Sequence, residues 1–282
     1  MAAMVVARDT AVSDAVETLC KGDGYLLFEG YFPPEKVREA RERTYELAEI
    51  EPDRTSHFHG DEAERTQKRV WNLPDKGEIF RELCSDPYIL SIMEPILGDD
   101  LMLSSYAANL LHPGAPAQEA HVDYPYWDLH TREHWPQTLN SSFFLAIETV
   151  LMLDEFTVDN GASAILPGSQ TRASWPAPDG FRQDSIRVTG PAGSLFMFPA
   201  LLWHAGQRNN SNESRGALLG SYTCKSIKPI EDWSRCISDD TIRVASDRMK
   251  SLLGVGYPYP AVMDDLAARS SEGARSKKGI TE

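Results

Sequence analysis

His121 and Asp123, separated by one residue, are the clearest chemical signal in the sequence. Side chains at positions i and i+2 of a strand point to the same face, so this imidazole and this carboxylate could bind one metal ion together. A third ligand must come from elsewhere, and His204, which follows an apolar strand-like run, is the best candidate. Two histidines and one carboxylate leave positions open on iron, whereas zinc prefers tetrahedral sites with fewer open positions. The three residues therefore predict a non-haem Fe(II) site in which they are the metal ligands and the catalytic groups.

Arg215 lies on the strand-like segment that follows His204. Its guanidinium has the fork geometry that binds a carboxylate. If a 2-oxo acid chelates the iron through its ketone and its C1 carboxylate, its far carboxylate needs such a partner. We therefore predict that Arg215 anchors a 2-oxo acid; the alternatives are a solvated arginine and a structural salt bridge.

Other histidines give weaker signals. The run from His130 to His134 formally matches H-x-x-E-H, an inverted zinc-protease motif that requires a helix. Pro125 and Pro136 flank this run, so we expect a loop or a single turn, which could form a lid over the iron. The run His57–His59 has strand spacing, but its charged flanks and the lack of a third ligand favour a loop.

A turn sequence between the two halves of the ligand set completes a pattern. It consists of Asn160-Gly161-Ala162 followed by Leu166-Pro167-Gly168-Ser169. With this turn between them, His121-x-Asp123 and His204, followed by Arg215, make the chain resemble the phytanoyl-CoA dioxygenase family of Fe(II)/2-oxoglutarate-dependent oxygenases. Gln170 stands where that family usually has a histidine, which leaves the role of this position open. The resemblance covers roughly residues 20–225.

The resemblance implies both a fold and a reaction. The fold is a double-stranded β-helix, the jelly-roll of cupin-like proteins. The cofactor is Fe(II), the cosubstrates are 2-oxoglutarate and O₂, and succinate and CO₂ are released. The resemblance also implies that Asn109 hydrogen-bonds 2-oxoglutarate, with Tyr106 and Ser105 as weaker candidates on the same strand. Asp123 argues against halogenation, because related halogenases have a small residue at this position.

Aromatic residues follow the first two ligands directly, in the run Tyr124-Pro125-Tyr126-Trp127. Aromatic side chains beside a metal site often line a substrate pocket. Tyr124, Tyr126 and Trp127 are therefore candidate substrate-binding residues, and packing in the core is the alternative for each of them.

The elements that must position these residues change in character near residue 100. Before it, apolar spacing predicts a helix at 12–19 that ends by Gly22, a strand at 25–28, a helix from Pro34, and a helical region at 77–97 that is broken at Pro87. The charged residues 51–69 are expected to form a loop. After it, turn sequences separate four strand-like segments, which are 101–111, 142–153, 194–199 and 216–224.

Helices followed by strands predict a mainly β fold with flanking helices. We expect a single domain over 1–266, with a helical part at about 1–100, a jelly-roll core at about 101–225 and a helical extension at about 226–266. The small and polar residues 267–282 are expected to be a disordered tail.

Composition limits the possible partners of this 282-residue chain. Its 28 Lys and Arg residues against 42 Asp and Glu residues give a net charge of −14, which disfavours nucleic-acid binding. No apolar run is long enough to span a bilayer, and no signal peptide is evident. The four cysteines are far apart and suit a reducing cytoplasm. The sequence leaves open whether the protein is a monomer or a homodimer.

Together these patterns predict a 2-oxoglutarate-dependent dioxygenase of the EC 1.14.11 type that hydroxylates a small organic molecule. A natural-product intermediate is preferred to an acyl-CoA thioester, because no cluster of basic residues for the CoA phosphates is evident. The alternatives are an acyl-CoA hydroxylase of the same family, a non-catalytic jelly-roll ligand-binding protein, and a metal-dependent hydrolase or isomerase on the same barrel.

Overall fold

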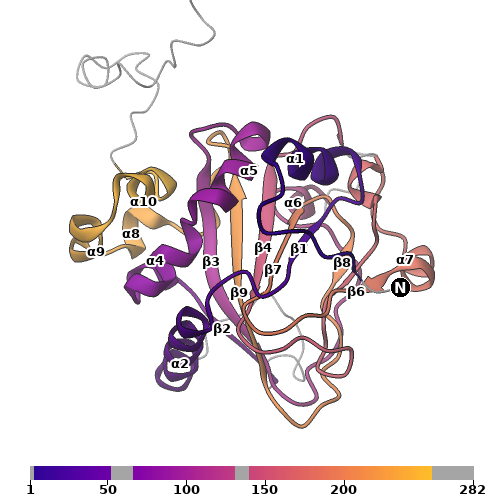
Figure 1. Ribbon diagram of the computed structural model, residues 1–282, viewed down its shortest axis with the longest axis horizontal. Coiled ribbons are helices and arrows are strands. Elements are labelled where there is room, and N and C mark those ends of the chain that lie inside the picture. The colour runs from indigo at the N-terminus through magenta and orange to yellow at the C-terminus, as the bar shows by residue number, and fades with distance from the viewer. Residues whose placement is uncertain (1–2, 52–65, 131–139, 256–282) are drawn as a thin grey trace, which may run out of the picture.

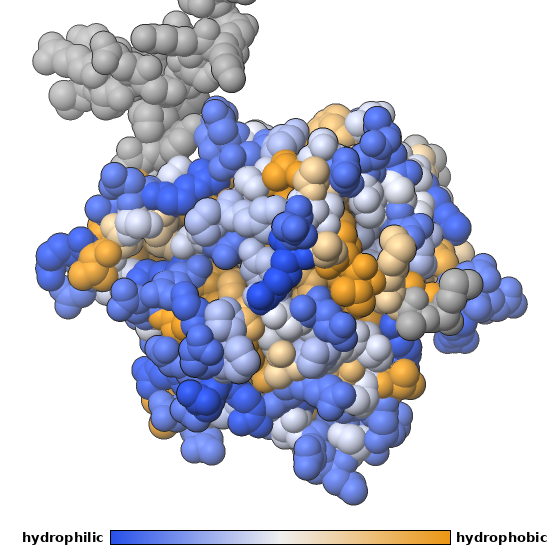
Figure 2. Space-filling model, viewed as in Figure 1, coloured by the Kyte–Doolittle hydropathy of each residue, from blue (hydrophilic) through white to orange (hydrophobic). Residues whose placement is uncertain are grey.

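The computed structural model describes residues 3–51, 66–130 and 140–255. The interpretations of His57–His59 and of His134, and the disordered tail expected at 267–282, lie outside these residues. None of the helices in the described ranges combines the length and hydrophobicity that crossing a bilayer requires. Polar side chains cover most of the face seen in Figure 2, with separate apolar patches between them.

A large antiparallel sheet and a small one form the jelly-roll (Figure 1). Among the described residues, the large sheet has six strands in the order β1 (Leu26–Phe28), β7 (Leu195–Pro199), β4 (Ala146–Met152), β9 (Arg215–Thr223), β3 (Met102–Leu111) and β2 (Gln67–Val70). The small sheet has the order β6 (Ile186–Arg187), β5 (Ala164–Ile165) and β8 (His204–Ala205), and a backbone bridge adds His121 to β8. The expected mainly β fold with flanking helices is therefore confirmed.

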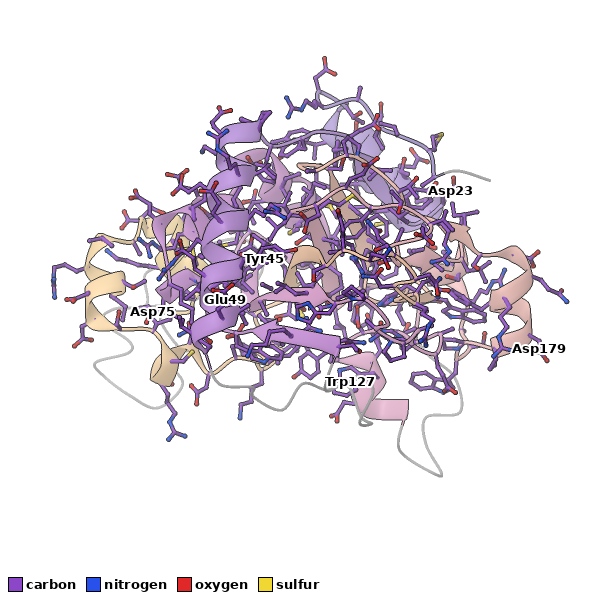
Figure 3. All side chains as sticks on the ribbon, turned by 90° about the horizontal axis from the view of Figure 1, so that it is seen from below. Asp23, Tyr45, Glu49, Asp75, Trp127 and Asp179 are labelled. Carbon is purple, nitrogen blue, oxygen red and sulfur yellow. The ribbon has the colours of Figure 1, made fainter. Side chains whose placement is uncertain are left out.

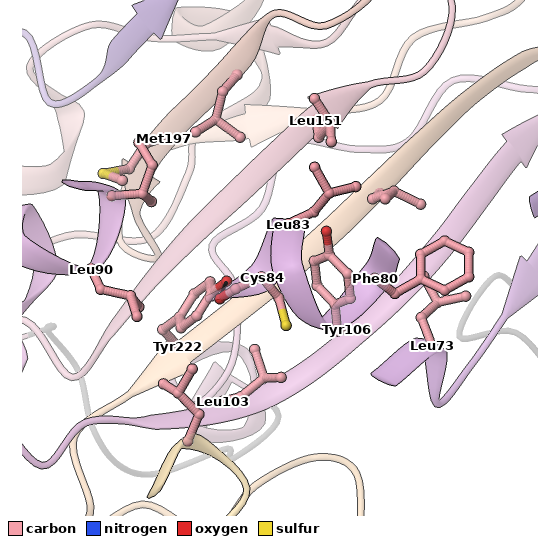
Figure 4. Packing of buried hydrophobic residues seen from close by; sticks show 14 of the residues in the cluster. Leu73, Phe80, Leu83, Cys84, Leu90, Leu103, Tyr106, Leu151, Met197 and Tyr222 are labelled. Atoms are coloured by element: carbon pink, nitrogen blue, oxygen red, sulfur yellow. Dashed lines mark hydrogen bonds between the residues drawn. The ribbon is translucent and has the colours of Figure 1, made fainter. Parts of the chain in front are cut away.

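Helices cover the outer face of the large sheet. They are α1 (Val12–Lys21), α2 (Pro34–Ile50), α4 (Glu78–Cys84) and α5 (Pro87–Leu97), with α10 (Asp247–Leu252) at one side. Their apolar residues pack against alternate strand residues such as Tyr106, Met197 and Tyr222, which Figure 4 shows around Leu83 and Cys84. Alternation is the rule for neighbouring strand residues, so the residues between these face the small sheet. This two-sided burial suits the apolar sequences of β1 and β7, whose residues are all buried.

Shorter helices complete the described chain. They are η1 (Leu73–Asp75), α6 (Tyr126–His130), η2 (Ser169–Thr171), α7 (Pro178–Asp184), α8 (Trp233–Cys236) and α9 (Asp239–Val244). The predicted break at Pro87 is confirmed, because this proline is the first residue of α5. The carboxylate of Asp86 caps α5 by accepting hydrogen bonds from the backbone N–H groups of Tyr88 and Ile89.

The prediction of a loop over 51–69 is wrong for its last residues, because β2 begins at Gln67. Residues Gln67–Val70 pair with β3 and form the edge of the large sheet. Charged residues surround this short segment in the sequence, so its alternation is hidden. Pairing with β3 is what makes it a strand, and that pairing is a tertiary contact.

Gln170 ties the turn after β5 to the end of α1. Its side chain is fully buried, and Nε2 donates to the carbonyl oxygens of Leu19 (3.3 Å) and Gly22 (3.0 Å). Gly24, with φ of +78°, packs so closely that a Cβ there would lie 2.2 Å from the Gln170 side chain. Gln170 thus satisfies carbonyl groups at the end of a helix.

We expect Gln170→Ala to lower the free energy of unfolding by about 1–3 kcal/mol, because it leaves buried carbonyl groups without a donor. Urea denaturation measures this change. The exposed neighbour offers a matched control, since Thr171→Ala should change stability by no more than about 0.5 kcal/mol. Equal stability of the Gln170→Ala and wild-type proteins would contradict the assigned role.

Candidate active site

A reciprocal pair of backbone hydrogen bonds places two of the three expected ligands side by side. The N–H of His121 donates to the carbonyl of His204 (2.9 Å), and the N–H of His204 donates to the carbonyl of His121 (3.1 Å). The two imidazole centroids are consequently 4.3 Å apart. The N–H of Asp123 donates to the carbonyl of Ala200 (2.8 Å), which fixes the third ligand next to them. One ligand atom from each of the three side chains lies within 4.8 Å of the others.

Both histidines are oriented for metal binding through Nε2. The Nδ1 atom of His121 lies 2.8 Å from the carbonyl oxygen of Glu119, and the Nδ1 atom of His204 lies 2.8 Å from that of Leu202. A carbonyl oxygen can only accept, so each Nδ1 carries the proton and each Nε2 keeps its lone pair. These Nε2 atoms lie 3.8 Å and 3.1 Å from the carboxylate oxygens of Asp123.

The charges of the three side chains suit a divalent cation. Burial alone would raise the pKa of Asp123, but the neighbouring His204 and His121 hold it below its ordinary value. Burial lowers the pKa of His121, and the adjacent His204 lowers it further. For His204 burial acts in the same direction, but Asp123 outweighs it and raises the pKa. The carboxylate is therefore ionised at neutral pH, as a metal ligand must be.

A cavity of about 670 Å³ between the two sheets contains all three ligands. Ser105 and Asn109 of β3 line this cavity, as residues that bind 2-oxoglutarate would have to. Tyr106 does not, because it points to the opposite face and packs among the core residues in Figure 4. The assignment of Tyr106 to the cosubstrate site is corrected accordingly, since adjacent strand residues face opposite sides of the sheet.

The three aromatic candidates separate in a similar way. Tyr124 lines the cavity, and its hydroxyl donates to the carbonyl of Lys228 (2.7 Å). Trp127, on α6, lines the cavity and is 41% exposed, at the lower edge of Figure 3. Tyr126 is buried in the core, where its hydroxyl accepts a hydrogen bond from the N–H of Leu145 (2.8 Å). Core packing was the alternative to substrate binding for all three residues, and Tyr126 packs in the core.

Arg215 is buried at the beginning of β9 and lines the same cavity. Its Nη2 donates to the carbonyl of Gly161 (3.2 Å), and its guanidinium carbon lies 3.9 Å from the ring centroid of Phe156. Burial lowers its pKa to about 10, so the guanidinium is still charged at neutral pH. Its Nε atom is buried without a hydrogen-bond partner among the described residues.

The Asn160-Gly161 part of the turn motif holds the Arg215 side chain in position. The side-chain oxygen of Asn160 accepts a hydrogen bond from the N–H of Thr157 (2.9 Å), and Gly161 follows with φ of +84°. A side chain at Gly161 would also collide with the carbonyl of Gln207, 2.5 Å from its Cβ. The Asn-Gly pair therefore builds a tight turn whose carbonyl orients the guanidinium.

The Leu166–Ser169 part of the motif holds the backbone next to His204 in position. The hydroxyl of Ser169 donates to the carbonyl of Leu166 (2.6 Å) and accepts from the N–H of Trp203 (2.8 Å). The N–H of Leu166 in turn donates to the carbonyl of Trp203 (2.9 Å). Because Trp203 precedes a metal ligand, these bonds hold the position of that ligand.

Several polar residues that line the cavity were missed in the sequence. They are Gln67 and Arg69 on β2, Glu148 on β4, and Ser221 on β9. Only pairing with β3 reveals the first two. The sequence could have indicated Glu148, because a carboxylate in the middle of an apolar strand is costly to bury unless it has a partner.

Curated relatives and solved structures are similar to this chain. The dioxygenase af480 of Aspergillus fumigatus is 26% identical over 76% of this chain and 66% of its own length. The uncharacterized protein Rv1501 of Mycobacterium tuberculosis is 29% identical over 60% of each chain. The alignment thus covers less than two thirds of either relative.

Two solved structures share the fold at low sequence identity. One is the epimerase SnoN in complex with Fe³⁺, α-ketoglutarate and nogalamycin RO, with a TM-score of 0.61, 18% identity, and coverage of 77% of this chain and 88% of that one. The other is the carbocyclase SnoK from nogalamycin biosynthesis, with a TM-score of 0.61, 20% identity, and coverage of 78% and 87%.

The phytanoyl-CoA dioxygenase (PhyH) family profile matches residues 20–217. The matched region is more than half of the chain, and it contains the three clustered ligands, both parts of the turn motif and Arg215. The chain therefore belongs to the phytanoyl-CoA dioxygenase family.

Proposed function

We propose that the protein is an Fe(II)- and 2-oxoglutarate-dependent dioxygenase that hydroxylates a small organic molecule, an activity of the EC 1.14.11 type. The observation that carries this proposal is the meeting of His121, Asp123 and His204 in one cavity with the buried Arg215. Two imidazoles and one carboxylate are the donor set that non-haem iron prefers when positions must stay open.

His121 and His204 would hold the iron through Nε2, and Asp123 through its carboxylate. Bound iron and 2-oxoglutarate supply the oxidation of a C–H bond by O₂, with release of succinate and CO₂. The backbone carbonyls on both Nδ1 atoms fix the imidazole orientations that such binding needs.

A group of buried polar atoms supports a cosubstrate site next to Arg215. The Nε atom of Arg215, Oδ1 of Asn109 and Oε1 of Gln67 are all buried without partners among the described residues. The three residues lie on neighbouring strands and line the same cavity. Buried polar atoms are costly unless they are bound. A carboxylate of 2-oxoglutarate would accept a hydrogen bond from Nε of Arg215, whereas the amide oxygens of Asn109 and Gln67 need a donor such as water.

The substrate would bind at the side of the cavity lined by Tyr124 and Trp127. A natural-product intermediate is supported by two similar structures, those of SnoN and SnoK from nogalamycin biosynthesis. Those two are an epimerase and a carbocyclase, so product analysis must distinguish hydroxylation from these outcomes. A cytoplasmic location without nucleic-acid or membrane partners stays a prediction.

The first test is an anaerobic titration of the metal-free protein with Fe(II) and 2-oxoglutarate, followed by visible absorption. A charge-transfer band that requires both additions would support chelation of the 2-oxo acid by protein-bound iron. Absence of the band in a folded, iron-loaded protein would contradict the proposal and favour a binding protein or a hydrolase.

Asp123→Ala should reduce iron-dependent succinate release to background, because it removes the only carboxylate from the ligand set while the backbone bond to Ala200 remains. Succinate assays and circular dichroism measure activity and folding. Asp179→Ala on α7 is the control, since Asp179 is exposed and distant from the cavity residues. Unchanged succinate release in the Asp123 variant would refute the iron assignment.

Arg215→Met should weaken 2-oxoglutarate binding by about ten- to a hundredfold, because a charge-assisted hydrogen bond to the far carboxylate is lost. Methionine retains packing against Phe156. Titration of the visible band with 2-oxoglutarate measures the change. Arg187→Met, which removes a guanidinium that donates to Ala162 outside the cavity, serves as the matched control. Equal 2-oxoglutarate affinity in both variants would contradict the role of Arg215.

A further inference from the structure

A group of polar side chains outside the cavity meets the backbone directly after Arg215. The N–H of Gly216 donates a hydrogen bond to Oδ2 of Asp154 (2.7 Å), and the hydroxyl of Tyr45 donates to the same oxygen (2.7 Å). Nε of Arg41 donates to the other oxygen, Oδ1 (2.5 Å). Asp154 follows β4, whereas Tyr45 lies on α2 (Figure 3), so this group joins a helix to two strands of the large sheet.

The glycine after Arg215 allows these groups to approach closely. A Cβ at Gly216 would lie 3.3 Å from Oδ2 of Asp154 and 3.3 Å from Cε2 of the Tyr45 ring. The hydroxyl of Tyr45 also lies 3.4 Å from the carbonyl oxygen of Ser214. Tyr45 and Asp154 therefore hold the backbone on both sides of Arg215, at the residue before it and at the residue after it.

Asp154 lies near Arg215 without occupying its N–H groups. The oxygens of Asp154 already accept three hydrogen bonds, and among the described residues the side chain of Arg215 donates only to the carbonyl of Gly161. The charge of Asp154 still favours the guanidinium, because it raises the pKa of Arg215 against the larger effect of burial. The arrangement keeps Arg215 charged and leaves N–H groups for a ligand in the cavity.

The position of Arg215 is consequently fixed from several directions. The ring of Phe156 lies 3.9 Å from its guanidinium carbon, the carbonyl of Gly161 accepts from Nη2, and Asp154 and Tyr45 hold its backbone. This fixed position matters for a ligand that is bound at both ends. If a 2-oxo acid chelates the metal at one end, its carbon chain decides where its far carboxylate lies, and a displaced guanidinium cannot meet it.

We propose that Asp154 and Tyr45 are positioning residues for the cosubstrate. By holding the backbone around Arg215, they set the place of its guanidinium and thereby the preference for a dicarboxylate with the chain length of 2-oxoglutarate. Neither residue lines the cavity, so both act through Arg215. This inference rests on the proposed function and deepens it, because it names what makes Arg215 selective.

The test compares two 2-oxo acids on the anaerobic, Fe(II)-loaded, full-length protein. 2-Oxopentanoate has the same chelating groups and chain length as 2-oxoglutarate but lacks the far carboxylate. Titration of the visible band gives the dissociation constant of each acid. We expect Asp154→Ala and Tyr45→Phe each to reduce the preference for 2-oxoglutarate by about three- to tenfold, the ratio that one hydrogen bond gives. The affinity for 2-oxopentanoate should stay unchanged.

Two further variants separate positioning from a general loss of stability. Asp154→Asn keeps an oxygen that accepts from the N–H of Gly216, so it should retain the preference. Tyr31→Phe is the matched control, because the hydroxyl of Tyr31 donates to Asp86 (2.8 Å), which in turn accepts backbone N–H groups, outside the cavity. It should lower the melting temperature as Tyr45→Phe does, but leave the preference for 2-oxoglutarate intact.

Several outcomes would overturn the inference. They are an unchanged preference in folded Asp154→Ala and Tyr45→Phe proteins, an equal loss of affinity for both acids, an equal loss of preference in Tyr31→Phe, and an Asp154→Asn variant as impaired as Asp154→Ala. Failure of the proposed function gives a different result, because the wild-type protein would then show no visible band or no preference for 2-oxoglutarate over 2-oxopentanoate.

Discussion

The two backbone hydrogen bonds between His121 and His204 are the interaction on which the site depends. They join segments that are far apart in the chain, and they add His121 to the small sheet next to β8. Once this pairing is formed, the two imidazoles lie side by side, and the backbone hydrogen bond from Asp123 to Ala200 places the carboxylate next to them. Carbonyl groups on both Nδ1 atoms then fix the tautomers. The ligand set is thus a consequence of sheet pairing rather than of side-chain contacts alone.

The large sheet gives this pairing a rigid support. Its outer face is covered by helices and its inner face by the small sheet, so its strands are buried on both sides. The turn motif holds both a metal ligand and Arg215 in position at the inner face. Ser169 holds the backbone before His204, and Gly161 presents a carbonyl to Arg215. A single connection therefore orients both a metal ligand and the predicted cosubstrate anchor.

Buried polar groups that lack partners mark the functional part of the cavity. Protein interiors rarely leave such groups unsatisfied, because each costs free energy. Here Nε of Arg215, Oδ1 of Asn109 and Oε1 of Gln67, unpartnered within the described part of the chain, lie on neighbouring strands and line one cavity. The same cavity contains the three clustered ligands.

The sequence by itself determined five strands of the large sheet, which are β1, β3, β4, β7 and β9, together with the turn motif and the candidate ligands. Apolar runs, Asn-Gly and Pro-Gly pairs and an H-x-D spacing are local properties. It also placed Asn109 and Ser105 on the correct strand. It could not determine which face of β3 points inward, so Tyr106 was assigned to the site although it packs in the core. Tyr126 was assigned to the substrate pocket because it follows the ligands in the sequence, although it too packs in the core. Only the tertiary structure made a strand of Gln67–Val70 and brought Glu148 next to Ser221, because both depend on pairing between strands that are distant in the chain.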